Sequence, residues 1–159
     1  MKLLFKQRLF AWLDSYDIFD ENQNTVFTVK GVMALKHCFK VYDAGGNEAG
    51  MIREKILTFF CPQFDLIIDG AEAGCIVKEF SFFKPKFTLD FRNWQIEGDW
   101  LQWNYQIQSP EGAVAVITKQ VFNWTDTYEI DIPDPKNALA ALMVVIAIDA
   151  GKCTQKKSR

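Results

Sequence analysis

The sequence predicts an all-β domain with one helix: a closed antiparallel barrel of about twelve strands around a buried hydrophobic helix near the C-terminus. Three observations predict it: an apolar and aromatic frame that recurs along the chain, turn sequences after most copies of the frame, and one long apolar run that follows an Asp-Pro pair. The 159 residues suit a single domain. A hydrophobic content of 49% excludes a disordered chain.

The frame consists of Lys or Gln, one residue, an apolar residue, two residues, an apolar residue, three residues, and then Phe or Tyr. Its copies end, 18 to 25 residues apart, at Tyr16, Phe39, Phe64, Phe87, Tyr105 and Tyr128, and the copy that ends at Tyr105 is one residue short. A period of this length indicates a repeated strand–turn–strand unit. Pro62 and Pro85 occupy the same place in two copies, between strands, where a missing N–H is tolerated.

The residues after the aromatics predict tight turns. Asp69-Gly70 is a strong hairpin signal, and the stretches 43–47 and 109–112 carry Gly, Asn, Ser and Pro between apolar runs. Five such hairpins and a last strand after Tyr128 make roughly eleven or twelve antiparallel strands. A sheet of that length usually closes or splits to hide its edges.

The last unit predicts a helix in place of a hairpin. Asp134 is a helix N-cap residue, Pro135 suits the first helical position, and Gly151 is the expected C-terminal cap. The eleven apolar residues 138–148 make the helix apolar on every face. They rise only about 16 Å, whereas a bilayer needs about 20 apolar residues. We therefore expect no transmembrane span, a single barrel domain over residues 1–151 with its core helix at about 135–150, and a basic, disordered tail over 152–159.

Composition and motifs exclude several functional classes. The net charge of −2 gives no general attraction to nucleic acid. Cys38, Cys61, Cys75 and Cys153 form no CxxC pair, which excludes a zinc ribbon and favours reduced thiols in the cytoplasm. Lys6 and Arg8 interrupt the apolar N-terminus too early for a signal peptide. No glycine-rich nucleotide motif is present, and we expect no cofactor and no metal.

Catalytic constellations are also missing from the sequence. His37 is the single histidine, and the adjacent Cys38 would point to the opposite face of a strand, so the two make no nucleophile–base dyad. One alternative is an enzyme with Asp126, Glu129 or Asp131 in a pocket at the barrel rim. Another is a carrier of a small apolar ligand, which the bulky residues Leu142, Met143, Val145 and Ile146 disfavour.

Three segments resemble bacterial members of the LURP-one-related family: residues 80–87, the stretch 94–103 that contains Glu97-Gly98-Asp99, and residues 124–128. The segment from Tyr128 through the apolar helix is similar as well, so the resemblance covers essentially the whole chain. It implies the tubby C-terminal-like superfamily, with phospholipid scramblases as relatives, and a barrel of about twelve strands around a hydrophobic C-terminal helix.

For function the resemblance implies little, because most LURP-one-related proteins have no established biochemistry. Tubby domains bind phosphoinositides, but no phosphoinositide-contacting motif matches this sequence. Scramblase-like proteins are associated with a calcium-binding segment near the terminal helix. The acidic residues of that neighbourhood lack the spacing of a calcium loop; they are Asp126, Glu129, Asp131 and Asp134.

Basic residues beside aromatic ones are the remaining signal. Lys84 and Lys86 follow Phe82-Phe83 at a predicted bend, and Arg92 lies on the next strand or turn. Such residues suit an anionic phospholipid or phosphoinositide headgroup, or an acidic protein partner. The frame, however, also predicts a core position for Phe83. We therefore expect a non-catalytic binding or scaffold module, cytoplasmic or peripheral at the inner membrane surface, with Lys84, Lys86 and Arg92 as its ligand contacts.

Overall fold

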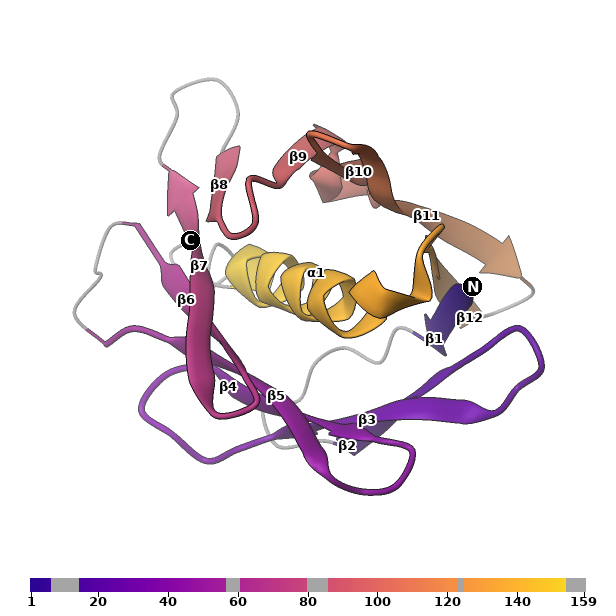
Figure 1. Cartoon of the computed structure of the whole chain (residues 1–159), viewed down its shortest axis with the longest axis horizontal. Helices are drawn as coiled ribbons and strands as arrows, with labels where there is room; N and C mark the ends of the chain where they lie inside the picture. Colours follow the sequence, from indigo (N-terminus) through magenta and orange to yellow (C-terminus); the bar gives the residue numbers. More distant parts are fainter. Residues whose placement is uncertain (7–14, 57–60, 80–85, 123–124, 154–159) are drawn as a thin grey trace.

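The computed structural model describes residues 1–6, 15–56, 61–79, 86–122 and 125–153. These residues form one antiparallel sheet of twelve strands that curls into a nearly closed barrel around a single C-terminal helix (Figure 1). The fold class predicted from the sequence and the buried position of the helix are both confirmed.

Strand order follows the chain almost completely. In the sheet the order is β8-β7-β6-β5-β4-β3-β2-β1-β12-β11-β10-β9, so β8 and β9 are its two end strands. The strands are β1 (Lys2–Lys6), β2 (Ser15–Phe19), β3 (Thr25–Gly31), β4 (Cys38–Asp43), β5 (Glu48–Glu54), β6 (Gln63–Ile68), β7 (Ala71–Glu79), β8 (Lys86–Asp90), β9 (Gln95–Asp99), β10 (Asn104–Ser109), β11 (Gly112–Phe122) and β12 (Thr125–Asp131).

The predicted hairpins are present. β4 pairs with β5 across residues 44–47, and β10 pairs with β11 across residues 110 and 111. β6 pairs with β7 across Asp69-Gly70, whose φ angles of 51° and 77° are both left-handed. Two left-handed residues give a turn whose twist matches that of the flanking strands, which is why Asp-Gly is selected there.

The recurring frame marks the entry to each even-numbered strand. Its final aromatic is the second residue of β2, β4, β6, β8 and β10, and the fourth residue of β12. Five of the six side chains are buried in the core, and Tyr16 is half-buried. The apolar frame position four residues before the aromatic is not always in the core. In the copy that ends at Phe39 this position is Leu35, which lies in a connection and is 84% exposed. Phe83, which the frame placed in the core, lies outside the described residues.

The helix begins and ends differently from the prediction. Asp134 does cap its start, since its carboxylate accepts a hydrogen bond from the Lys136 N–H at 3.1 Å. Pro135, however, opens a 3₁₀ turn, η2 (Pro135–Asn137), and helix α1 (Ala138–Cys153) follows it. The expectation that Gly151 ends the helix is wrong, because α1 continues through it.

Gly151 is selected by packing against strand β8. A Cβ atom at this position would lie 2.8 Å from Cζ of Phe87, so only glycine allows this close approach. The Lys78 ammonium, on β7, donates a hydrogen bond of 2.7 Å to the Gly151 carbonyl. A side chain of the sheet therefore satisfies a carbonyl in the last turn of the helix.

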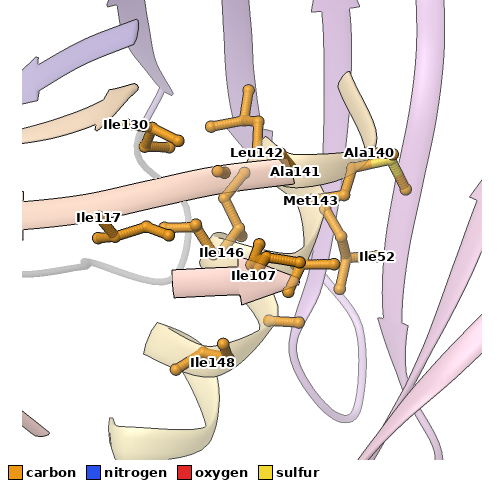
Figure 2. Packing of buried hydrophobic residues seen from close by; sticks show 14 of the residues in the cluster. Ile52, Ile107, Ile117, Ile130, Ala140, Ala141, Leu142, Met143, Ile146 and Ile148 are labelled. Carbon is orange, nitrogen blue, oxygen red and sulfur yellow. The ribbon is translucent and has the colours of Figure 1, made fainter. Parts of the chain in front are cut away.

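The core lies between the helix and the inner face of the barrel. Every residue from Ala140 to Ile148 is at most 3% exposed. Figure 2 shows Leu142, Met143 and Ile146 of the helix among isoleucines of the surrounding strands, Ile52, Ile107, Ile117 and Ile130. In the part of the chain that the structure describes, no helix is long and apolar enough to cross a membrane.

Candidate functional site

Large apolar side chains are exposed at one end of the barrel. Because the strands alternate in direction, the connections that enter even-numbered strands lie at the same end of the sheet. Three of these connections carry Met33 (83% exposed), Leu35 (84%), Ile56 (53%) and Leu101 (44%). We call these four residues the apolar rim. Among the described residues, one further large apolar side chain is exposed, Val116 on β11 at 39%.

The C-terminal end of the helix lies at the same end of the barrel. Gly151 contacts Phe87 and lies near Phe64, the aromatics at the entries to β8 and β6. The Lys152 ammonium lies 3.9 Å from the centre of the Trp103 ring, directly before β10. The apolar rim and the C-terminal end of the helix therefore lie at the same end of the barrel.

A buried polar cluster anchors the connection that carries Met33 and Leu35. Nδ1 of His37 lies 2.5 Å from Oε2 of Glu54, and the Lys36 ammonium donates to Oε1 at 3.1 Å. The Glu54 N–H donates to the His37 carbonyl at 2.8 Å. Burial opposes ionisation of Glu54, but the hydrogen bonds from His37 and Lys36 hold its pKa below the ordinary value. The single histidine thus has a structural partner, and the connection presents its apolar residues from a fixed base.

A groove of about 360 Å³ lies beside Leu101, between the two end strands of the sheet. Its lining comes from β8, from β9 and from the 3₁₀ turn η1 (Trp100–Gln102): Lys86, Phe87, Ile96, Gly98, Asp99, Trp100 and Leu101. The rings of Phe87 and Trp100 meet edge to face at 4.8 Å. The Asp99 carboxylate accepts hydrogen bonds from the N–H groups of Leu101 (3.1 Å) and Gln102 (3.3 Å), which fixes the turn.

Two of the three basic residues predicted to contact a ligand are described. Lys84 lies outside the described residues. Lys86 begins β8 and lines the groove, whereas Arg92 follows the other end of β8, with its guanidinium 4.8 Å from the Phe91 ring centre. Lys86 and Arg92 therefore lie at opposite ends of β8, and their shared role as ligand contacts stays a prediction.

The comparisons with known proteins agree with this fold. A model of the LURP-one-related family matches residues 1–149, which is nearly the whole chain.

This chain belongs to the LURP-one-related family.

Two relatives are similar to this LURP-one-related protein over nearly their whole length. The uncharacterized protein YxjI of Bacillus subtilis (strain 168) is 26% identical over 150 residues, covering 94% of this chain and 92% of YxjI. An X-ray structure of a protein from Arabidopsis thaliana superposes with a TM-score of 0.62 at 19% identity, covering 94% of this chain and 91% of that one. The second match shows the common fold alone.

Two of the three carboxylates of the enzyme alternative, Glu129 and Asp131, have described side chains, and neither lines a described pocket. Glu129 and Asp131 alternate along β12 with the buried Tyr128 and Ile130, so they lie on the outer face of the barrel. Glu129 pairs with the Lys2 ammonium at 2.7 Å. The side chain of Asp126 lies outside the description. Within the described ranges, no group of three His, Cys, Asp or Glu side chains could hold a metal ion.

The interior also bears on the carrier alternative. Leu142, Val145 and Ile146 of the helix, with Phe5 and Trp103 of the strands and turns, line a void too small for a water molecule. Helix packing therefore leaves no room for a carried ligand at that place.

Asp149, the residue that interrupts the apolar run in the sequence, lies beside this void, and sequence reasoning assigned it no role. Burial raises its pKa to about 7, and the nearby Lys152 ammonium partly opposes the shift. Desolvation raises the pKa values of Tyr16 and Tyr105, and both lie close enough to Asp149 for its charge to raise them further. The sequence signal that could have identified this group is a single carboxylate directly after a long apolar run.

Proposed function

We propose that this LURP-one-related protein is a non-catalytic binding and scaffold module that docks on the anionic inner surface of the cytoplasmic membrane through its apolar rim. One observation carries the proposal: four of the five exposed large apolar side chains in the described structure lie at the same end of the barrel. Scattered exposed apolar residues are ordinary, but such residues gathered at one end mark an interaction surface.

The composition of the rim favours a lipid surface. Lys36 and Lys55 flank the apolar residues, and Lys86 lies beside Leu101 at the groove. Burying one large aliphatic side chain contributes about 1.5–3 kcal/mol, and a lysine at an anionic surface about 1 kcal/mol. Lys36 and Lys55 lie near Glu54 and Asp65, which reduces their contribution. Together, these apolar and electrostatic contributions support a reversible, salt-sensitive attachment to the membrane, for which apolar insertion and charge are both needed.

The first test is co-sedimentation with vesicles of phosphatidylcholine alone, or mixed with phosphatidylserine or with a phosphoinositide, at low and high salt. We expect salt-sensitive binding to the anionic vesicles. The double variant Met33→Ser/Leu35→Ser should lose at least about tenfold in affinity, because two exposed anchors are removed without touching the core. Val116→Ser is the matched control, since it removes an exposed apolar residue away from the rim.

A second pair of variants tests the charge contribution. Lys86→Glu should weaken binding to anionic vesicles, whereas Lys136→Glu, at the opposite end of the barrel beside the start of the helix, should not. Equal binding to both anionic compositions would mean that net charge is recognised, and a preference for the phosphoinositide would indicate headgroup recognition. If the Met33→Ser/Leu35→Ser protein sediments with vesicles as well as the unmodified protein does, the apolar rim is not the membrane-docking surface.

A further inference from the structure

The barrel has a seam between β8 and β9. Strand β8 pairs with β7, and β9 pairs with β10, each over five registered residue pairs. In the described residues no ladder joins β8 to β9, although the two strands are consecutive in the chain. Among the described strands, each therefore has one edge whose backbone N–H and C=O groups face no partner strand.

The turn between the two strands shows how the seam arises. Arg92 and Asn93 are both left-handed, with φ angles of 51° and 54°, and the Trp94 N–H donates to the Phe91 carbonyl at 2.9 Å. Phe91 and Trp94 are buried, with their rings edge to face at 5.0 Å. The turn closes as a hairpin turn would. On either side of it, however, β8 lies along β7 and β9 lies along β10, so the two strands diverge from the turn (Figure 1).

The groove described above occupies this seam at the end of the apolar rim. Its volume of about 360 Å³ lies at the low end of the roughly 300–1,000 Å³ range of ligand sites. Phe87, Ile96 and Trp100 make an apolar lining. Gly98 also lines it, but the glycine itself is required by the neighbouring strand β10, because a Cβ here would lie 2.8 Å from the Asn104 carbonyl oxygen.

We propose that the seam is a docking site for an extended segment of a partner protein, which adds a strand to the open edge at β8–β9. Unpaired backbone donors and acceptors in a row are complementary to another extended backbone. The apolar lining selects an apolar side chain of the segment. The Lys86 ammonium selects a neighbouring carboxylate, because the Asp99 carboxylate on the opposite side is held by N–H groups of its own turn.

The chemistry of the segment follows from this geometry. It is extended, it alternates apolar and polar residues, it carries Asp or Glu next to the apolar residue that enters the groove, and it lacks proline because proline cannot donate to the ladder. The site goes beyond membrane docking: it makes the barrel an adaptor that holds a second protein at the end where it meets the membrane.

The first measurement is amide hydrogen exchange by NMR on the full-length protein without a ligand. In β8 and β9, we expect the backbone amides that point into the seam to exchange much faster than the amides of β5. Strand β5 pairs with strands on both sides. Slow exchange of every amide in β8 and β9 would mean that the seam is closed in solution, which overturns the proposal.

The second measurement identifies the ligand chemistry with a display library of random seven-residue peptides. Enriched peptides should alternate apolar and polar residues, carry an acid and lack proline, and their binding should slow exchange of the outward-facing amides of β8 or β9. Leu101→Glu and Lys86→Glu should each lower peptide affinity at least about tenfold. Val116→Glu is the matched control, because it adds the same charge at an exposed apolar position away from the seam.

Three outcomes overturn the proposal: no enriched peptide, peptides that bind the Leu101→Glu protein equally well, or protection of the seam that rises with protein concentration as a dimer forms. The last outcome would make a second copy of the chain the occupant. The Met33→Ser/Leu35→Ser protein should lose vesicle binding and keep peptide binding, so failure of the membrane proposal and failure of this one are distinguishable.

Discussion

At the scale of single residues, the buried ionisable groups shape the helix end of the barrel. Lys78 donates to the Gly151 carbonyl, and Glu54 accepts from His37 and Lys36, so each has a defined partner. Asp149 is different, because desolvation dominates its surroundings and its pKa rises to about 7. A carboxyl group in that state makes the stability of the protein depend on pH near neutrality.

Asp149→Asn is therefore expected to change the pH dependence of stability. The folded state holds a proton on Asp149 up to a pKa of about 7, whereas the unfolded chain releases it near its ordinary value of about 4. The folded state binds more protons in that window, so the contribution of Asp149 is fully present below pH about 4 and is lost as pH rises towards 7. The asparagine has no proton to lose.

The measurement is urea unfolding of both proteins at pH values of about 5 and about 8, where the stability of the asparagine protein relative to the unmodified one should rise by about 2–3 kcal/mol. Tyr16, Tyr105 and Lys152 face Asp149 and are unchanged in the comparison. A free-energy difference between the two proteins that is independent of pH would show that Asp149 does not titrate in this range.

Residue-scale prediction from sequence succeeded where a local rule was sufficient. The N-cap at Asp134 and the turn at Asp69-Gly70 follow from backbone geometry within a few residues. The assignment of Gly151 as a cap failed, because its neighbour Phe87 is 64 residues earlier in the chain and only folding brings them together. The position of Lys86 in a groove escaped detection for the same reason.

At the scale of elements, the helix is the piece that the strands enclose. Its apolar run is uniform around the helix axis, so no face is suited to water and every face must meet an apolar partner. Val145 lies in the middle of the run and is fully buried.

Val145→Asp is expected to prevent folding. A carboxylate at this position has no partner in the dry core, and the cost of several kcal/mol is comparable with a total stability of roughly 5–15 kcal/mol. Circular dichroism and a ¹H–¹⁵N spectrum of the variant measure the outcome. Val116→Asp, on the exposed face of β11, should fold normally. A soluble Val145→Asp protein with a cooperative unfolding transition would contradict the enclosed-helix arrangement.

At the scale of the whole molecule, the twelve-stranded sheet has two weak junctions that divide it into halves. Strands β2–β8 form one half, and β9–β12 with β1 form the other. The first junction is the open seam between β8 and β9, and the second is the β1–β2 pairing, for which one registered pair, Leu4–Phe19, is described. The helix packs against both halves, with Ile18 of the first and Trp103 of the second lining one void beside it.

Because the helix supplies the core of both halves of the sheet, we expect the halves to unfold together. Isoleucine methyl signals from the first half (Ile18, Ile52, Ile76) and from the second (Ile107, Ile117, Ile130) should disappear at the same denaturant concentration in NMR spectra. Two separate midpoints would show that each half has an independent core and that the helix belongs to one of them.

Periodicity, turn chemistry and the apolar run are local properties, and they were sufficient for the approximate strand count, the hairpins and the enclosed helix. The family was recognised separately, from the resemblance of three segments and the terminal helix, and the family model confirms it. The recurring aromatics identified the entry to each even-numbered strand because a strand alternates its faces with a period of two. None of these local properties carries information on which strands fail to pair, even when the two strands are consecutive in the chain. The apolar rim at one end, the seam between β8 and β9, and the buried environments of Asp149 and Gly151 are decided by the closing of the barrel, which sets the distances between residues far apart in the sequence.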